Sequence, residues 1–410
     1  MPCDAEFYFR IKFRRTPMAI AQKVKNSMEQ SSWIRKMFEQ GALLKAQYGA
    51  DQVCDFSLGN PNLEPPPAVH QALLKILQES PAALHAYMPN AGHPETRSAV
   101  ADFLSREHGL PFTFKDIIMT CGAAGAINAV LKALINPGDE VIVLAPYFVE
   151  YLFYVDNFQG QPKIVSTRPD FLPDLTAIQE AITPRTKAIL INSPNNPTGR
   201  VYDQTIIQGL GDLLADYSRK GQVIYLVADE PYRKIVYDGV QVPSAFQAYN
   251  ESIVVTSYSK DLSLPGERIG FLAVNPQAPD RDELIDAMTL TNRILGFVNA
   301  PALMQRVLIG LQGQTVDINL YQRKRDLFCN GLSQAGYQFD RPEGAFYLFP
   351  RSPIPDEVAF VQALQEERIL TVPGRGFGAP GYFRIAYCVA DEVIERSLPG
   401  FARVMKKFTL

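Results

Sequence analysis

The feature that most constrains the fold is an alternation of short apolar runs with longer segments of helical spacing along the middle of the chain. Runs of strand character occupy residues 116–121, 141–144, 163–167, 187–191, 223–228, 253–256 and 266–274. Segments of helical length lie between several of them, as at 123–135 and 204–220. Short apolar strands that alternate with helices are typical of a mostly parallel sheet covered by helices on both faces. The sequence therefore predicts an α/β fold.

Both ends of the chain have a different character. A proline-rich stretch at 60–67 marks a break before the alternating part. After about residue 301 the pattern predicts a long charged helix over 302–332, followed by short elements at 344–349, 358–366 and 382–387. Helices mixed with isolated strands are typical of an α+β arrangement.

These changes predict how the chain divides. We expect a large α/β domain of residues 70–300 with a mostly parallel sheet flanked by helices. A small α+β domain would be built from both chain ends, residues 18–69 and 301–410. Residues 1–17 carry spaced charges without an uninterrupted apolar core, so we expect a disordered extension and not a secretory signal.

Composition excludes several classes of function. The net charge is −3, with 40 basic and 43 acidic residues, so no global field favours nucleic acid or an anionic membrane. No apolar run approaches the ~20 residues that span a bilayer. The five cysteines are scattered without a CxxC spacing, which fits a reducing, cytoplasmic compartment. The four histidines show no HExxH pattern, so we expect no metal site.

The informative residues for chemistry follow the strands, because ligands bind outside the carboxyl ends of strands in open α/β sheets. After the first run, Ala123 and Ala124 lie in a Gly-Ala-Ala-Gly segment that opens a helix, where free N–H groups suit an anion. A tight strand–helix turn explains this segment equally well. After the second run, the ring of Phe148 could stack on a flat ligand or belong to the core.

Three later strand ends carry polar groups. Asn196 lies in an Asn-Asn-Pro-Thr-Gly loop, which a plain turn would also explain. Asp229 ends a very apolar strand and needs a cationic or hydrogen-bonding partner there, unless it caps a helix. Lys260 follows the strand at 253–256, with Ser257 before it and Arg268 after it. Desolvation or cationic neighbours would make this lysine nucleophilic; a surface lysine is the alternative.

Taken together and in this order, the motifs resemble the class I/II aminotransferases of the aspartate aminotransferase type, which have fold type I and use pyridoxal 5′-phosphate (PLP). The resemblance covers about residues 30–400. It rests on Tyr87 within HAYMPNAGHPETR, the NNPTG loop, the DEPY segment at 229–232, SYSKDLSLPGERIG at 257–270, and FRIAY at 383–387.

The resemblance implies roles at the ring of the cofactor. Lys260 would hold PLP as a Schiff base and carry the proton between the substrate Cα and the cofactor. Asp229 would pair with the pyridine nitrogen, and Tyr232 and Asn196 would hydrogen-bond the 3-oxygen. Phe148 aligns with the stacking aromatic of the family; an alignment shifted by one residue would assign that role to Tyr147.

The resemblance also implies how the phosphate is held. Ala123 and Ala124 would offer backbone N–H groups, and Ser257 and Arg268 would add a hydroxyl and a charge. Tyr87 resembles the tyrosine that reaches the phosphate of a neighbouring subunit, which implies a homodimer with shared active sites.

For the substrate, Arg384 resembles the arginine that grips the α-carboxylate, with a structural arginine as the alternative. Gly59 and Asn196 would line the substrate pocket, although Gly59 would also suit a turn. Arg293 is a candidate reader of an acidic side chain, or an exposed or dimer-interface arginine. Here the sequence departs from the dicarboxylate-specific pattern, because no second cation is obvious.

These roles predict an aminotransferase that moves an α-amino group between an L-amino acid and a 2-oxo acid. A PLP-dependent lyase acting at Cα or Cβ would use the same cofactor residues. A PLP-sensing transcriptional regulator would need a DNA-binding module, for which the residues before the matching region are too few.

Overall fold

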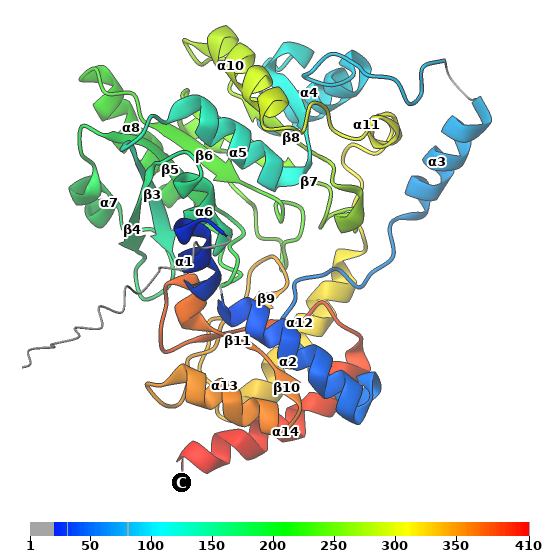
Figure 1. Cartoon of the computed structure of the whole chain (residues 1–410), viewed down its shortest axis with the longest axis vertical. Coiled ribbons are helices and arrows are strands. Elements are labelled where there is room, and N and C mark those ends of the chain that lie inside the picture. The colour runs from blue at the N-terminus through cyan, green and yellow to red at the C-terminus, as the bar shows by residue number, and fades with distance from the viewer. Residues whose placement is uncertain (1–19, 31, 80–81, 410) are drawn as a thin grey trace, which may run out of the picture.

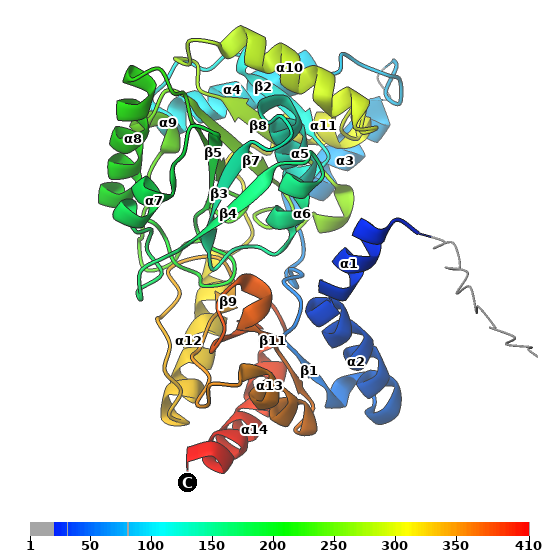
Figure 2. The same cartoon turned by 60° about the vertical axis from the view of Figure 1, so that its left-hand side comes forward.

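The computed structural model describes residues 20–30, 32–79 and 82–409. The predicted extension at 1–17 lies outside these residues. The chain forms two parts, a larger one around a twisted sheet and a smaller one that holds the C-terminus (Figures 1 and 2). Among the described helices, none combines the length and the apolar character needed to cross a membrane.

The larger part contains a seven-stranded sheet in the order β2-β8-β7-β6-β5-β3-β4. β8 runs antiparallel to both of its neighbours, and the other pairs are parallel. The predicted α/β fold with a mostly parallel sheet is thus confirmed. The strands are β2 (Ile117–Thr120), β3 (Glu140–Ala145), β4 (Gln161–Ser166), β5 (Thr186–Asn192), β6 (Tyr225–Asp229), β7 (Ser252–Ser257) and β8 (Gly270–Val274).

Helices bury both faces of this sheet, which explains why its strands are apolar throughout. In β3, Ile142 and Leu144 join the cluster under one set of helices, whereas Val141 and Val143 join the cluster under the other. Successive strand residues point to opposite faces, so both sets of positions must be apolar. One face is covered by α4 (Pro94–His108), α7 (Leu175–Ala181), α8 (Gln204–Arg219), α9 (Ala245–Ala248) and α11 (Ala302–Leu308), and the other by α5 (Gly122–Leu134), α6 (Glu150–Asp156) and α10 (Arg281–Ile294).

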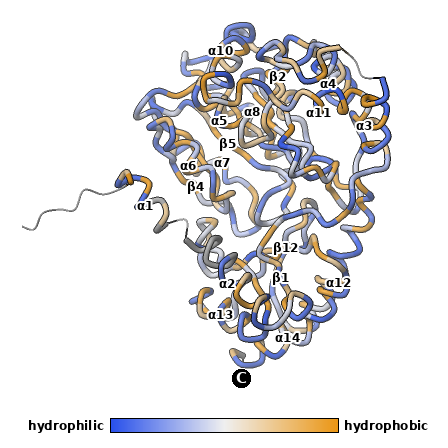
Figure 3. The backbone as a smooth tube through the Cα atoms, turned by 45° about the vertical axis from the view of Figure 1, so that its right-hand side comes forward, coloured by the Kyte–Doolittle hydropathy of each residue, from blue (hydrophilic) through white to orange (hydrophobic). Residues whose placement is uncertain are grey.

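The smaller part has its own core, rich in aromatic side chains such as Phe56, Phe328 and Phe401. Its helices and strands come from both ends of the described chain: α2 (Ser32–Tyr48), β1 (Cys54–Asp55), α12 (Ile318–Gln334), β9 (Tyr347–Leu348), α13 (Glu357–Glu366), β10 (Ile369–Leu370), β11 (Val372–Pro373), β12 (Phe383–Ala386) and α14 (Asp391–Thr409). Its outer helix α14 alternates hydrophilic and hydrophobic stretches (Figure 3). α1 (Gln22–Gln30) contacts α6 through an ion pair between Lys23 and Asp156.

The prediction of one helix over 302–332 is wrong. The chain forms α11 and α12, with residues 309–317 between them. Gly313 in this connection has φ +84°, a left-handed conformation that a continuous helix does not permit. α11 packs on α3 (Pro67–Glu79) and α4, whereas α12 packs on α14. The helical spacing continues along the sequence, but the packing partner changes.

The expected strand at 266–274 is too long. Residues 265–267 form a single 3₁₀ turn, and Arg268 has φ +51°, so the strand begins only at Gly270.

The packing of α11 bears on the domain boundary. Met304, Val307 and Leu308 belong to the cluster that covers the large sheet. We therefore propose the two-domain division with residues 302–311 on the side of the large sheet, and not with the small domain that was expected to begin at 301.

A close helix contact provides a test of this packing. A Cβ on Gly211 of α8 would lie 2.2 Å from the carbonyl oxygen of Ala248. Alanine normally stabilises a helix interior by about 1 kcal/mol relative to glycine. At this position we expect Gly211→Ala to lower the free energy of unfolding by about 1–3 kcal/mol, because α8 and α9 must separate. Gly310→Ala, which meets nothing within 4 Å, is the control and should change it by less than about 0.5 kcal/mol. Equal urea-unfolding curves for the two variants would contradict the packing.

Candidate active site

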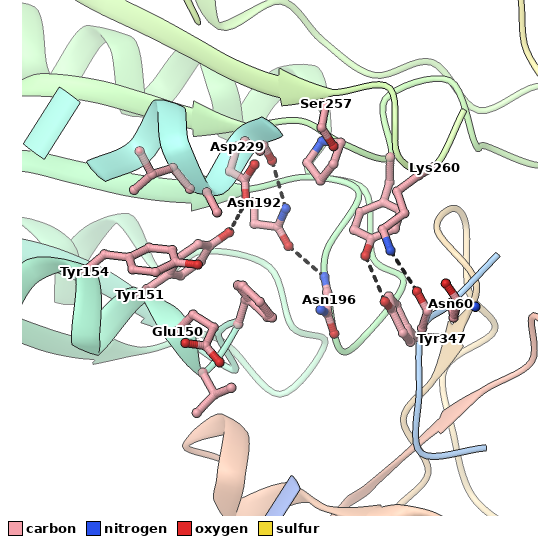
Figure 4. A pocket seen from close by; sticks show the side chains of 18 of the residues that line it. Asn60, Glu150, Tyr151, Tyr154, Asn192, Asn196, Asp229, Ser257, Lys260 and Tyr347 are labelled. Carbon is pink, nitrogen blue, oxygen red and sulfur yellow. Dashed lines mark hydrogen bonds between the residues drawn. The ribbon is translucent and has the colours of Figure 1, made fainter. Parts of the chain in front are cut away.

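A cavity of about 430 Å³ opens where the carboxyl ends of the large sheet face the smaller part. Of the predicted site residues, all but Tyr87 and Arg293 line it. Figure 4 shows side chains from the strand ends, from α6 and from the smaller part converging on this space. The charged or polar lining residues are Asn60, Glu150, Tyr151, Tyr154, Asn192, Asn196, Asp229, Tyr232, Ser257, Lys260, Arg268, Tyr347 and Arg384.

Asp229 places a carboxylate at the floor of the cavity, at the end of β6. Its Oδ2 accepts a hydrogen bond of 2.5 Å from Tyr151 Oη, whereas its buried Oδ1 has no partner within the described residues. Burial raises the pKa of the Asp229 carboxyl to about 7, and the hydrogen bond from Tyr151 opposes that rise. A turn follows at 231–234, so Asp229 caps no helix. The free oxygen offers a place for an N–H donor from a ligand.

Lys260 lies across the cavity, in the loop that follows β7. Its Nζ donates a hydrogen bond of 2.7 Å to the carbonyl oxygen of Gly59 and lies 5.5 Å from the ring centre of Phe346. Burial, with a smaller contribution from the positive charges of Arg384 and Arg268, lowers the pKa of the Lys260 amine to about 8, against an opposing effect of Cys388. The surface-lysine alternative is therefore wrong. At pH 7 this pKa leaves roughly a tenth of the amine uncharged, far more than the ordinary lysine value of about 10.4 would leave, and the uncharged form is the nucleophile.

Arg384 of β12 is buried without a carboxylate partner in the ranges that the structure describes. Its Nη1 donates to Asn196 Oδ1 at 3.0 Å, and its Nη2 donates to the carbonyl oxygen of Ser57 at 2.7 Å, while Nε has no partner. The guanidinium also lies 4.9 Å from the ring centre of Tyr347 and 4.7 Å from that of Phe377. Burial lowers the pKa of Arg384. A buried cation without an acid is costly, so the arrangement suits an anionic ligand.

Another part of the cavity wall is formed by the start of α5 and the Arg268 loop. Ala123 and Ala124 lie in the first turn of α5, where backbone N–H groups are free. A Cβ on Gly122 would lie 3.1 Å from Arg268 Nη2, so the guanidinium lies against the start of this helix. Ser257 lines the same space. Helix dipole, hydroxyl and guanidinium together match a phosphate.

The structure shows which of the neighbouring aromatic residues Phe148 and Tyr147 faces the cavity. Phe148 lines the cavity and lies edge-on to Tyr151, with ring centres 5.5 Å apart. Tyr147 is buried outside the lining, and a Cβ on Gly378 would lie 2.6 Å from its ring. Of these two residues, Phe148 is therefore the one whose ring is available to a ligand in this cavity.

Tyr232, Tyr347 and Gly59 form one packed unit. The hydroxyls of Tyr232 and Tyr347 are 2.8 Å apart and share a hydrogen bond. A Cβ on Gly59 would lie 2.0 Å from Tyr347 Oη, so only glycine fits there. This close approach, and not a turn, explains the glycine. It also brings the carbonyl oxygen of Gly59 to Lys260.

The sequence analysis missed several lining residues. Tyr151, which bonds Asp229, and Glu150 and Tyr154 lie on α6, a few residues beyond the strand-end motif that was considered. Asn192 orders the Asn196 loop, since its Oδ1 accepts from the Asn196 backbone N–H at 2.8 Å. A sequence signal existed for α6, because polar and aromatic residues recur there at helical spacing.

Two predicted residues lie elsewhere. Tyr87 is 92% exposed, and Arg293 on α10 is also exposed; neither lines the cavity. Their predicted roles stay predictions, because the role of Tyr87 requires a second copy of the chain. No group of three or more side chains suited to a metal ion occurs in the described part of the chain.

Comparison with known proteins agrees with the class that this fold and site define. Residues 51–399 match the family model described as aminotransferase class I and II. The chain belongs to this family, whose members use PLP, and is a transaminase.

Particular relatives cover nearly the whole chain. A probable aspartate/prephenate aminotransferase of Thermus aquaticus is 34% identical over 94% of this chain and 99% of its own length. The crystal structure of an aminotransferase from Eubacterium rectale is 40% identical, covers 96% of this chain and 100% of its own, and has a TM-score of 0.92. The aspartate aminotransferase of Thermus thermophilus with maleate is 30% identical over 94% of this chain and 100% of its own, with a TM-score of 0.83.

The lowered pKa of Lys260 gives a prediction for the cofactor-free protein. Acetylation of the peptide that contains Lys260 should rise with pH and reach half its maximal rate near pH 8, because only the uncharged amine reacts. The measurement is competitive labelling with acetic anhydride followed by mass spectrometry. Lys260→Arg, which should lose this labelled peptide, is the control. A midpoint near the ordinary lysine value of about 10.4 would contradict the desolvated environment.

Proposed function

We propose that this transaminase binds PLP in the cavity as a Schiff base on Lys260 and moves the α-amino group of an L-amino acid to a 2-oxo acid. One observation carries the proposal. A lysine of lowered pKa faces, across a single cavity, a buried carboxylate whose second oxygen lacks a partner in the described residues. Such a pair suits a group with an aldehyde at one end and a ring nitrogen at the other.

The described residues fit this cofactor along its length. Asp229 Oδ1 is free to accept from a protonated ring nitrogen, and Tyr151 holds the other oxygen in place. Phe148 offers a ring for stacking. Tyr232 and Asn196 offer donors to the 3-oxygen. The phosphate would be held by the first turn of α5, with Ala123 and Ala124, and by Ser257 and Arg268.

The residues then divide the chemistry among them. When bound, PLP supplies an aldehyde carbon for the amino group and a ring that withdraws electrons from Cα. With the substrate amine bound to the cofactor, Lys260 would be free, and its uncharged Nζ would move the proton between the substrate Cα and the cofactor C4′. Asp229 keeps the ring nitrogen protonated. Because the pKa of its carboxyl is raised by burial, a bound cation restores its negative charge.

Arg384 would orient the amino acid. Its guanidinium binds the α-carboxylate through two parallel hydrogen bonds and so fixes the direction of the Cα–H bond. The hydrogen bonds to Asn196 and Ser57 fix the orientation of the guanidinium before a substrate binds. Gly59 would line the substrate side of the cavity, where it allows the close approach of Tyr347 and holds Lys260 through its carbonyl oxygen.

The assembly belongs to the same proposal. We propose a homodimer in which Tyr87 reaches the phosphate site of a second copy, because its 92% exposure leaves the side chain accessible to another chain. Arg293 would lie near that interface. The cysteines in the described residues, Cys54, Cys121, Cys329 and Cys388, are free, which supports a reducing compartment such as the cytoplasm.

Borohydride reduction tests the central claim. Treatment of the holoenzyme should attach the cofactor permanently to one peptide, the one that contains Lys260, which peptide mass spectrometry identifies. Lys260→Ala is the control and should give no labelled peptide. A label on any other lysine would overturn the assignment. The same holoenzyme, given an amino acid alone, should release one equivalent of 2-oxo acid per site, whereas a lyase would release ammonia continuously.

Arg384 gives a second prediction. Arg384→Ala should lower kcat/KM for the amino donor by about 100-fold, mainly through KM, because a charge-assisted carboxylate contact worth about 3 kcal/mol is lost. Steady-state kinetics measure this change. Arg384→Lys should recover little, since an ammonium cannot bind a carboxylate bidentately. Bound cofactor, read from absorbance, should remain in both variants. Loss of cofactor from both would mean that Arg384 does not act on the substrate.

A further inference from the structure

One charged side chain that lines the cavity has no role in the proposed function. In the proposed function, Lys260 forms the Schiff base, Arg268 meets the phosphate, Arg384 meets the α-carboxylate and Asp229 meets the ring nitrogen. Among the described lining residues, the remaining charged side chain is Glu150. It is the first residue of α6, and Figure 4 shows it on the same wall as Tyr151 and Tyr154, below the Asp229 end of the cavity.

Glu150 has no hydrogen bond or ion pair with any residue of the described ranges. It is half-buried, and burial raises the pKa of its carboxyl because no cation offsets the loss of solvent. Its place at the start of α6 gives a carboxylate a modest benefit from the helix dipole. A carboxylate at the start of α6 would interact with the helix dipole equally well if its side chain were directed into solvent. The dipole therefore does not explain why Glu150 lies on the cavity wall.

The substrates that this wall would accept follow from charge. A donor with an acidic side chain would bring a second carboxylate beside Glu150, and like charges repel. An aliphatic donor would remove water from Glu150 without giving it a partner, which is costly. A donor whose side chain ends in an ammonium or guanidinium group would give this carboxylate the cation it lacks.

We propose that Glu150 is a specificity residue that selects amino donors with a positively charged side chain, such as ornithine, lysine or arginine. This inference rests on the proposed function. The α-carboxylate of the donor would meet Arg384 on the side of the smaller part, and its distal cation would meet Glu150 on α6. The two ends of the substrate are thus read by opposite charges from opposite walls.

The test compares ornithine with norvaline, which has the same side-chain carbons but no distal amine. The wild-type holoenzyme should show a kcat/KM for ornithine at least about tenfold above that for norvaline, the usual scale for one partly buried charge pair. Glu150→Gln keeps the shape of the side chain and should reduce this ratio by about tenfold. Glu95→Gln makes the same change in the first turn of α4, outside the cavity, and should leave the ratio unchanged.

Each outcome decides the inference. Loss of the ratio in Glu150→Gln, with kcat/KM for norvaline retained, supports it; retained norvaline turnover also shows that the variant is folded. An unchanged ratio overturns it. A wild-type preference for aspartate or glutamate over ornithine also overturns it and would favour Arg293 as the side-chain reader. These outcomes differ from failure of the proposed function, in which no amino acid is transaminated and borohydride leaves Lys260 unlabelled.

Discussion

Asp229, Lys260 and Arg384 are ionisable groups that are largely removed from water and face one cavity without forming ion pairs within the part of the chain that the structure describes, and the rest of the site depends on this constraint. Each would be more stable in water, and no ion pair among the described residues compensates any of them. Hydrogen bonds from the surrounding protein offset part of the free-energy cost of removing these groups from water. These bonds orient each group but do not neutralise its charge. Tyr151 orients Asp229, the carbonyl oxygen of Gly59 orients Lys260, and Asn196 orients Arg384. The site is therefore complementary to a ligand that carries the missing charges.

The two-part fold is what brings these groups together. Asp229 ends β6 and Lys260 follows its parallel neighbour β7, so the pairing of these two strands brings both residues to the same edge of the sheet. Arg384 and Gly59 come from the smaller part and reach the same space through β12 and the segment after β1. Because Arg384 bonds both Asn196 and Ser57, it touches the two parts at once. Any movement between the parts would change the substrate end of the cavity while leaving the Asp229 end intact.

The sequence predicted the site residues whose position follows from the order of the strands. It failed for the features that tertiary packing determines. The strand ends at Asp229 and Lys260 were predictable, because apolar strands are easily recognised and their carboxyl ends must share an edge. Tyr151 and Tyr347 were missed, since their importance comes from partners 78 and 115 residues away in the chain. The split between α11 and α12 was missed because helical spacing says nothing about which core a helix joins. The sequence predicts a phosphate contact for Arg268, but the left-handed φ of this residue required the structure.

Neighbouring residues of α6 serve different ends of the ligand, and this separation has a consequence for specificity. Tyr151 is fixed by its hydrogen bond to Asp229, so the start of α6 has a set position relative to the cofactor end. Glu150 precedes it on the cavity wall and has no structural partner among the described residues. A change at Glu150 therefore alters the charge that the substrate side chain meets without loosening the carboxylate that tunes the ring. A scaffold built this way can keep its chemistry while its substrate changes, and relatives named for aspartate need not share the donor of this chain.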